Sequence, residues 1–151
     1  MRLRIAVAGA ALALALAACG SDGSDDGSAP QASTDPAELT GVVWVLDDAT
    51  RGALAEEAPE ASDITLEFAD DGTVSGNAGC NTYSGSYEAD DQGSMSFGQA
   101  AMTQMACGEA VMALESNYLQ TLGQVTAFAI DEGNLIMQAV NVQLTYGPQA
   151  S

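Results

Sequence analysis

The chain has 151 residues, of which 21 are acidic, three are basic and none is histidine, so its formal charge is −18. A Ser-His-Asp or Cys-His nucleophile is excluded, because its general base is missing. Binding to nucleic acid depends on cationic contacts to phosphate, which so acidic a chain does not offer. A glycosidase built on two carboxylates is chemically conceivable, yet no acidic pair lies in a recognisable motif. We therefore do not expect an enzyme.

The first 18 residues have the three parts of a secretory signal peptide. Two arginines among the first four residues are followed by an apolar run from Ile5 to Leu16, and two alanines then precede Cys19. The run has about 12 residues, whereas a helix needs about 20 to cross the hydrocarbon core of a membrane. We therefore expect residues 1–18 to be removed on export.

The sequence Leu-Ala-Ala-Cys that ends at Cys19 resembles the lipobox of bacterial lipoproteins. The resemblance implies cleavage before Cys19 and a diacylglycerol on its thiol, whose two acyl chains would anchor where a single chain is marginal. After cleavage one basic residue, Arg51, remains against 21 acidic ones, a charge of 1 − 21 = −20. Anionic headgroups would repel such a protein, so the lipid alone has to hold it. We expect an extracytoplasmic protein, anchored by lipid to the outer face of a bacterial cell membrane.

Residues 19–40 consist mostly of Gly, Ser, Asp, Pro and Ala, with almost nothing to bury. Such a composition cannot offset the entropy lost on ordering the chain, so a flexible acidic tether is expected. About 20 flexible residues span roughly 25 Å, enough to hold a domain clear of the headgroups. One folded domain, 41–147, should follow.

From residue 42 onward apolar and polar residues mostly alternate, which is typical of strands with one buried face. Short strands are expected at 42–46, 64–68, 73–78, 83–88, 94–97, 125–130, 135–139 and 142–146. Residues 50–62 are rich in Ala, Glu and Pro and predict a loop with room for a helical turn.

One segment changes to helical spacing. Its apolar residues recur every three or four positions from Glu109 to Leu122, and Gly123 is suited to a C-terminal cap. We expect one helix at about 108–122 and about eight short strands. An antiparallel sheet, curled around this helix or covered by it, gives an α+β fold that is mainly antiparallel β.

Acidic pairs lead into glycine at three predicted turns, in residues 70–72, 90–93 and 131–133. Asp tolerates turn geometry and Gly supplies a positive φ, so hairpin turns explain these pairs. No segment has the spacing of an EF-hand loop, and we predict no metal site and no cofactor. The acidity is then mainly a solubility device, with capture of a cationic partner as the alternative.

Cys80 and Cys107 are an even pair in a chain expected to be exported, and a disulfide is their simplest role. The bond would close a loop of about 28 residues and contribute about 3.5 kcal/mol in the chain-entropy model. A reactive thiol is the alternative, because Cys107 precedes the predicted helix, whose dipole favours a thiolate. The absence of histidine disfavours that alternative.

Two separate motifs resemble the META domain, the family of bacterial HslJ-like proteins. The first is VSGNAGCNTYSG, from Val74 to Gly85, and the second is AAMTQMACGEAVMALE, which contains Cys107. The family pattern is G-C-N-x-x-x-G, then T-x-M-A-C and a helix bearing M-x-x-E. The matching residues are Gly79, Cys80, Asn81 and Gly85, then Thr103, Met105, Ala106, Cys107, Met112 and Glu115.

The resemblance covers roughly residues 40–147 and implies a small half-open antiparallel β-barrel with one helix. Members of the family are often membrane-anchored and associated with stress or antibiotic tolerance, and no enzymatic activity is established for the domain. The chain departs from the commonest pattern at two positions. Gln104 stands where Arg is frequent, which removes a potential ion pair, and Gly108 stands where Pro often opens the helix.

The motif residues are expected to be structural. Tight backbone geometry is expected at Gly76, Gly79 and Gly85, and Asn81 can close a turn with its side chain. Thr103 and the methionines that flank Cys107 should secure the segment entering the helix. The methionines Met95, Met102, Met105, Met112 and Met137 are expected to fill the core, with an adaptable apolar groove as the alternative.

The leading hypothesis for function is a non-catalytic module of the cell envelope that binds a protein partner or an apolar ligand, with a role in stress tolerance. A purely structural or surface-display lipoprotein is the alternative. An acidic cation-binding module is a weaker one.

Overall fold

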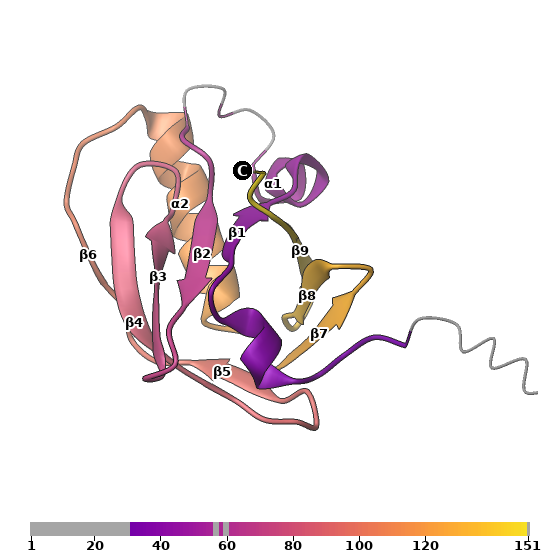
Figure 1. Cartoon of the computed structure of the whole chain (residues 1–151). Coiled ribbons are helices and arrows are strands. Elements are labelled where there is room, and N and C mark those ends of the chain that lie inside the picture. Colours follow the sequence, from indigo (N-terminus) through magenta and orange to yellow (C-terminus); the bar gives the residue numbers. More distant parts are fainter. Residues whose placement is uncertain (1–30, 56–57, 59–60, 151) are drawn as a thin grey trace, which may run out of the picture.

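The computed structural model describes residues 31–55, 58 and 61–150 (Figure 1). Nine strands form one antiparallel sheet in the order β5-β4-β3-β2-β1-β9-β8-β7, with β6 paired to β4. The strands are β1 (Val43–Leu46), β2 (Thr65–Phe68), β3 (Thr73–Asn77), β4 (Thr82–Ala89), β5 (Met95–Phe97), β6 (Ala101–Met102), β7 (Ala127–Asp131), β8 (Asn134–Gln138) and β9 (Gln143–Pro148).

The sheet curls until its two ends meet. Ser94, just before β5, pairs with Ala127 at the start of β7. The N–H of Phe128 donates to the carbonyl of Gly93 at 2.8 Å. The result is a nearly closed barrel, and the prediction of a mainly antiparallel α+β fold is confirmed. The two edge strands, β5 and β7, lie closer together than in the half-open barrel that the resemblance implied.

The acidic pairs lie in hairpin turns, as predicted. The carboxylates of Asp71 and Asp90 each accept the backbone N–H two residues further along, at 2.9 and 3.0 Å. Between β7 and β8 the two turn residues, Glu132 and Gly133, have φ of 50° and 80°, the positive values that a tight type I′ hairpin needs. Turn geometry therefore accounts for the placement of these carboxylates.

The expected alternation along the strands is confirmed by which side chains are buried. In the second strand Leu66 and Phe68 face the core, and Glu67 between them is exposed. The largest side chains that are fully buried are Tyr118, Tyr146, Phe68, Leu39, Ile64, Leu66, Leu114, Leu135, Met137 and Leu144. They come from the barrel strands, the long helix and the N-terminal segment, so one continuous core joins all three.

The long helix α2 (Glu109–Leu122) confirms the predicted helix. Its buried face includes Val111, Leu114 and Tyr118, at the spacing that the sequence indicated. Gly108 precedes it without a side-chain cap, and at its end the N–H of Gly123 donates to the Leu119 carbonyl at 3.1 Å. In Figure 1 this helix lies behind β2, β3 and β4.

A second helix, α1 (Asp48–Leu54), lies where the sequence predicted the start of a loop. The carboxylate of Asp47 caps it by accepting the N–H of Thr50 at 2.6 Å, and Thr50 and Leu54 are buried. The described residues therefore contain a second α-helix where the sequence analysis expected a loop with room for a helical turn. Because α1 is seven residues long and buries only two side chains, it is too short to show a helical period in the sequence.

The folded part of the chain begins before residue 41. Ser33 pairs with Ile130 in β7, and a 3-10 helix, η1 (Pro36–Leu39), follows. Leu39 is fully buried, and its carbonyl accepts the indole N–H of Trp44 at 3.0 Å. The prediction of a flexible tether was therefore wrong from Ser33 onward. A buried leucine and two backbone pairings, of Ser33 with Ile130 and of Thr40 with Phe68, fix a segment whose composition is otherwise that of a linker.

Three predictions fall outside the described residues: the signal peptide 1–18, the lipid site Cys19 and the first part of the tether. They stay predictions. Within the described part of the chain, no helix is both long and apolar enough to span a membrane.

Candidate functional site

Asn81 joins the two sequence motifs through its side chain. Its Oδ1 accepts the hydroxyl of Thr103 at 2.9 Å and the N–H of Met105 at 2.7 Å. Its Nδ2 also donates to the Met105 carbonyl at 3.5 Å. The sequence analysis predicted that the Asn81 side chain closes a local turn, and that prediction was wrong. Asn81 is buried and holds a segment 24 positions away, because the sheet brings that segment beside it.

Glu115, on α2, also bonds Asn81. The contacts that Asn81 makes with Thr103, Met105 and Glu115 are called the junction below. The Oε2 of Glu115 accepts the Asn81 N–H at 2.7 Å and its Oε1 accepts the Asn81 Nδ2 at 2.8 Å. The glutamate is only 6% exposed. A buried carboxylate is tolerated when strong, charge-assisted hydrogen bonds replace its water. The M-x-x-E part of the motif thus fastens the helix to the turn between β3 and β4, which carries Asn81.

The predicted disulfide between Cys80 and Cys107 is confirmed, with 6.2 Å between the two Cα atoms. It fastens the same junction covalently, because Cys80 is the neighbour of Asn81 and Cys107 lies just before α2. Neither sulfur is then available as a nucleophile. Thr103, placed by its bond to Asn81, also accepts the N–H of Thr82 at 3.2 Å.

Three buried tyrosines form a hydrogen-bonded chain through the core that the sequence analysis missed. The Tyr83 hydroxyl donates to the Thr65 carbonyl at 3.1 Å, so the Tyr118 hydroxyl donates to Tyr83 at 2.9 Å. The Tyr146 hydroxyl then donates to Tyr118 at 3.2 Å. Burial raises the pKa of all three hydroxyls well above the usual value of 10.0. Tyr83, Tyr118 and Tyr146 are called the tyrosine chain below.

Gly76 makes room for the end of the tyrosine chain. A Cβ at this position would overlap the Thr65 carbonyl oxygen and lie 2.9 Å from the Tyr83 hydroxyl. The prediction of close packing at Gly76 is therefore correct. Gly79 has φ of 105°, a left-handed conformation that side chains rarely adopt.

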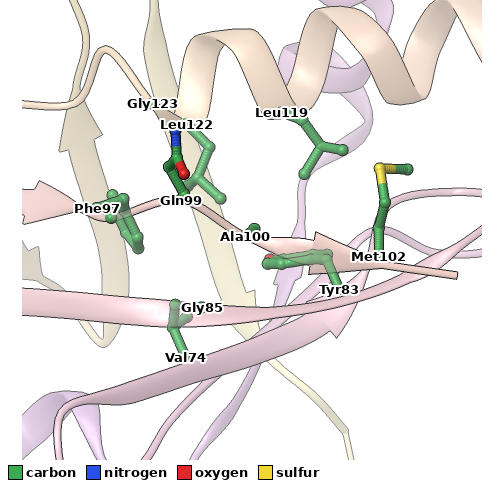
Figure 2. Close-up of a pocket in the computed structure, with 11 residues that line it drawn as sticks. Val74, Tyr83, Gly85, Phe97, Gln99, Ala100, Met102, Leu119, Leu122 and Gly123 are labelled. Carbon is green, nitrogen blue, oxygen red and sulfur yellow. The ribbon is translucent and has the colours of Figure 1, made fainter.

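A cavity of about 460 Å³ lies between the C-terminal end of α2 and the inward face of β4, the face that carries Tyr83 (Figure 2). Helix α2 contributes Leu119, Leu122 and Gly123, and β4 contributes Tyr83 and Gly85. The segment from Phe97 to Met102 forms much of the remaining wall. Figure 2 shows Leu119 and Leu122 pointing from the helix toward that segment, with Phe97 and Met102 at its opposite ends.

Most of the side chains that line this cavity are apolar. Gln99 is the one amide side chain among the lining residues, and the hydroxyl of Tyr83 is occupied by the tyrosine chain. A Cβ at Gly85 would lie 3.2 Å from the Cα of Ala100, so the glycine lets the segment before β6 pass close to β4. Sequence reasoning did not find the cavity, because its walls come from separate elements.

The methionines divide between the core and the surface. Met95 and Met137 are buried, as predicted for core residues. The prediction was wrong for Met102, Met105 and Met112, which are 41%, 57% and 48% exposed. Met105 secures its segment through its backbone, which bonds Asn81, and leaves its side chain in solvent. Met102 lines the cavity, which agrees with the groove alternative at that one position.

The charged groups of the described residues do not gather into a metal site. In the parts of the chain that the structure describes, no three residues among His, Cys, Asp and Glu gather as metal ligands. Arg51 donates to the carbonyls of Ala58 and Ala61, each at 3.0 Å, and so fastens the loop after α1.

Comparison with known proteins bears on the junction and the barrel together. A family model described as the META domain matches residues 37–151. The chain belongs to the META-domain family. The match covers both motifs that the junction joins, and its start agrees with a fold that begins before residue 41. The family resemblance expected from the two motifs is therefore correct.

Two solved structures are similar to this META-domain protein. An NMR structure of a protein from Burkholderia xenovorans is 28% identical, has a TM-score of 0.61, and the alignment covers 82% of this chain and 93% of that one. A second NMR structure is 20% identical with a TM-score of 0.58, over 75% of this chain and 93% of its own, and supports the fold alone. No curated protein matches the chain.

Proposed function

We propose that this protein is a non-catalytic module of the bacterial cell envelope, anchored by a lipid on Cys19, that binds an apolar ligand in the cavity between α2 and β4. The cavity carries the proposal. Its volume of about 460 Å³ lies within the range of about 300–1,000 Å³ typical of small-molecule sites. Met102 lines it and is 41% exposed, so a ligand can reach it from solvent.

Two observations favour binding over catalysis. Apart from the Tyr83 phenol, the lining residues include no acid, base or thiol. The buried groups that could act as acids or bases are already hydrogen-bonded, since Glu115 accepts from Asn81 and each hydroxyl of the tyrosine chain donates to another hydroxyl or to the Thr65 carbonyl. A site of this kind can hold an apolar molecule without reacting with it.

The binding proposal is tested with N-phenyl-naphthylamine, an uncharged apolar dye whose fluorescence rises when it leaves water. We expect saturable binding to the mature protein. Leu119→Trp fills the cavity and should weaken binding about tenfold or more, which is about 1.4 kcal/mol. Val140→Trp is the matched control, because Val140 is 68% exposed and lies outside the cavity lining.

A second cavity variant, Ala100→Leu, guards against a folding defect in Leu119→Trp, because Ala100 is exposed and lines the cavity from the strand side. The melting temperature of every variant is measured beside the titration. If folded Leu119→Trp and Ala100→Leu both bind the dye as the original protein does, the cavity is not a binding site.

The anchoring part of the proposal has a separate test. Cys19→Ser should prevent incorporation of labelled palmitate and release the protein from the membrane fraction. With no cationic surface to hold anionic headgroups, the lipid is the only attachment expected. Membrane association of Cys19→Ser at the original level would contradict it.

The alternative, a surface-display lipoprotein without a ligand, predicts no saturable dye binding at all. A role in stress tolerance rests on the resemblance to HslJ-like proteins. It predicts that cells lacking the protein grow normally without stress and less well under envelope stress. In those cells, the Val140→Trp protein should restore growth under stress and the Leu119→Trp protein should not.

A further inference from the structure

We infer that the cavity selects a cationic amphiphile: an alkyl chain carrying an ammonium group, rather than a neutral or anionic headgroup. This inference rests on the proposed function, because it names the class of ligand for the same cavity. Three features carry it, and each acts independently of the others.

The first feature is the end of α2, which borders the cavity through Leu119, Leu122 and Gly123. The carbonyl end of a helix carries a partial negative charge, equivalent to about half an elementary charge. In many helices a basic side chain in the last turn offsets that charge. The last turn of α2 contains no basic residue. Backbone N–H groups of residues 123–125 bond the carbonyls of Leu119, Thr121 and Leu122, but no basic side chain offsets the negative helix end, so this end favours a cation over an anion.

The second feature is a pair of aromatic rings in the wall. Tyr83 and Phe97 line the cavity, Tyr83 from β4 and Phe97 from the end of β5. The negative face of an aromatic ring attracts an ammonium group, and quaternary ammonium ligands are often recognised in this way. A sulfate or carboxylate headgroup gains no comparable attraction from an aromatic ring.

The third feature is the charge of the whole domain. After residue 30 the chain carries 18 acidic residues (21 less Asp22, Asp25 and Asp26) and one basic residue. That residue, Arg51, is held by two loop carbonyls and is not among the residues of the cavity wall. No cationic side chain lines the wall to receive an anionic headgroup. The surrounding field would also raise the rate at which a cation arrives, an effect that salt reduces.

The test compares three probes with the same ten-carbon chain, each below its micelle concentration: decyltrimethylammonium, decyl maltoside and decyl sulfate. Calorimetry with the mature protein should give the tightest binding for the ammonium probe. We expect about tenfold over the maltoside, because the helix end and a cation–π contact each contribute about two- to fivefold. Decyl sulfate should bind more weakly than either.

A pair of variants with equal net charge isolates the helix end. Gln120→Lys puts a cation in the last turn of α2, at an exposed position, and should weaken the ammonium probe about two- to fivefold while sparing the maltoside. Gln143→Lys adds the same charge at an exposed position of β9 and should leave both probes unchanged. Phe97→Leu keeps the wall apolar and should reduce the preference for the ammonium probe.

The outcomes separate the two proposals. If the maltoside or the sulfate binds as tightly as the ammonium probe, the inference about charge is overturned and the cavity remains an apolar site. Equal effects of Gln120→Lys and Gln143→Lys would also overturn it, because only net charge would then matter. If no ten-carbon probe binds and the uncharged dye does not bind either, the proposed function itself fails.

Discussion

Asn81→Ala tests whether the junction with Glu115 holds the barrel and α2 together. The substitution removes the Nδ2 donor to Glu115 and the Oδ1 acceptor for Thr103 and Met105. Alanine keeps its backbone N–H, so the Glu115 carboxylate, 6% exposed, retains one of its two hydrogen bonds. The weaker bond from Nδ2 to the Met105 carbonyl is lost as well.

The expected loss follows from those contacts. A hydrogen bond to a charged group contributes about 1.5–3 kcal/mol, and a shielded donor left without an acceptor costs about 1–3 kcal/mol. We therefore expect the free energy of unfolding to fall by about 3–5 kcal/mol. Since domains of this size have a net stability of about 5–15 kcal/mol, that is a large fraction of the total.

Urea unfolding measures the change through the fluorescence of Trp44, which is 3% exposed in the folded protein. The midpoint should fall with little change in slope. Asn117→Ala is the matched control. Its Nδ2 donates to the Leu54 carbonyl at 2.8 Å, a bond between uncharged groups at an exposed side chain. Its expected cost is about 1 kcal/mol.

A double-mutant cycle with Glu115→Gln shows whether the two residues act as a pair. Once Asn81 is alanine, replacing Glu115 should cost at least about 1 kcal/mol less than it does alone. An Asn81→Ala loss no larger than that of Asn117→Ala would refute the reasoning, and so would strictly additive effects of Asn81→Ala and Glu115→Gln.

Three further outcomes are expected. Replacing Cys80 and Cys107 together by serine should lower the free energy of unfolding by about 3–4 kcal/mol in urea, and an unchanged midpoint would contradict a structural disulfide. In thermal melts Gly76→Ala should lower the melting temperature strongly, because its Cβ would overlap the Thr65 carbonyl oxygen. Gly85→Ala should have a small effect, because its new Cβ needs only a slight shift of neighbours. Equal falls in melting temperature for the two variants would contradict this difference in packing. Burial raises the pKa of the three hydroxyls of the tyrosine chain. Their contribution to the free energy of unfolding is therefore fully present below about pH 10, the unfolded value, and is lost as the pH rises through their pKa in the folded protein. Tyrosinate absorbance should therefore appear together with unfolding for these three residues, and ionisation of all of them in the folded state would disprove their burial.

Sequence reasoning succeeded where structure depends on neighbours along the chain. The strand at 64–68 follows from alternation, and α2 follows from helical spacing over four turns. The turn at Glu132 and Gly133 was indicated by Gly133, which is suited to positive φ, whereas the φ of 50° at Glu132 is one that glutamate rarely adopts. The disulfide followed from the count of cysteines and the expected export, without any knowledge of the fold.

It failed where distant segments meet. Nothing near Leu39 indicates that the residue is buried beneath Trp44, since its neighbours have the composition of a linker. The tyrosine chain joins residues from β4, α2 and β9. The apolar pattern of each element predicts that its own tyrosine is buried, but it does not show that the three hydroxyls bond one another. The cavity likewise exists only after β4 and α2 have been brought together. The family motif identified Asn81 and Glu115, and their shared contact became visible only in three dimensions.

The pairing of Ser33 with Ile130 has a consequence for the protein among copies of itself. A nearly closed barrel still has two edge strands, and an open edge invites strand addition from another molecule. On one side β7 meets the turn before β5, and further along Ser33 exchanges two hydrogen bonds of 2.7 Å with Ile130. If the protein is concentrated on a membrane by its lipid, as proposed, the segment that leads away from the anchor also blocks intermolecular sheet growth. The linker would then keep crowded neighbours apart as well as holding the domain off the surface.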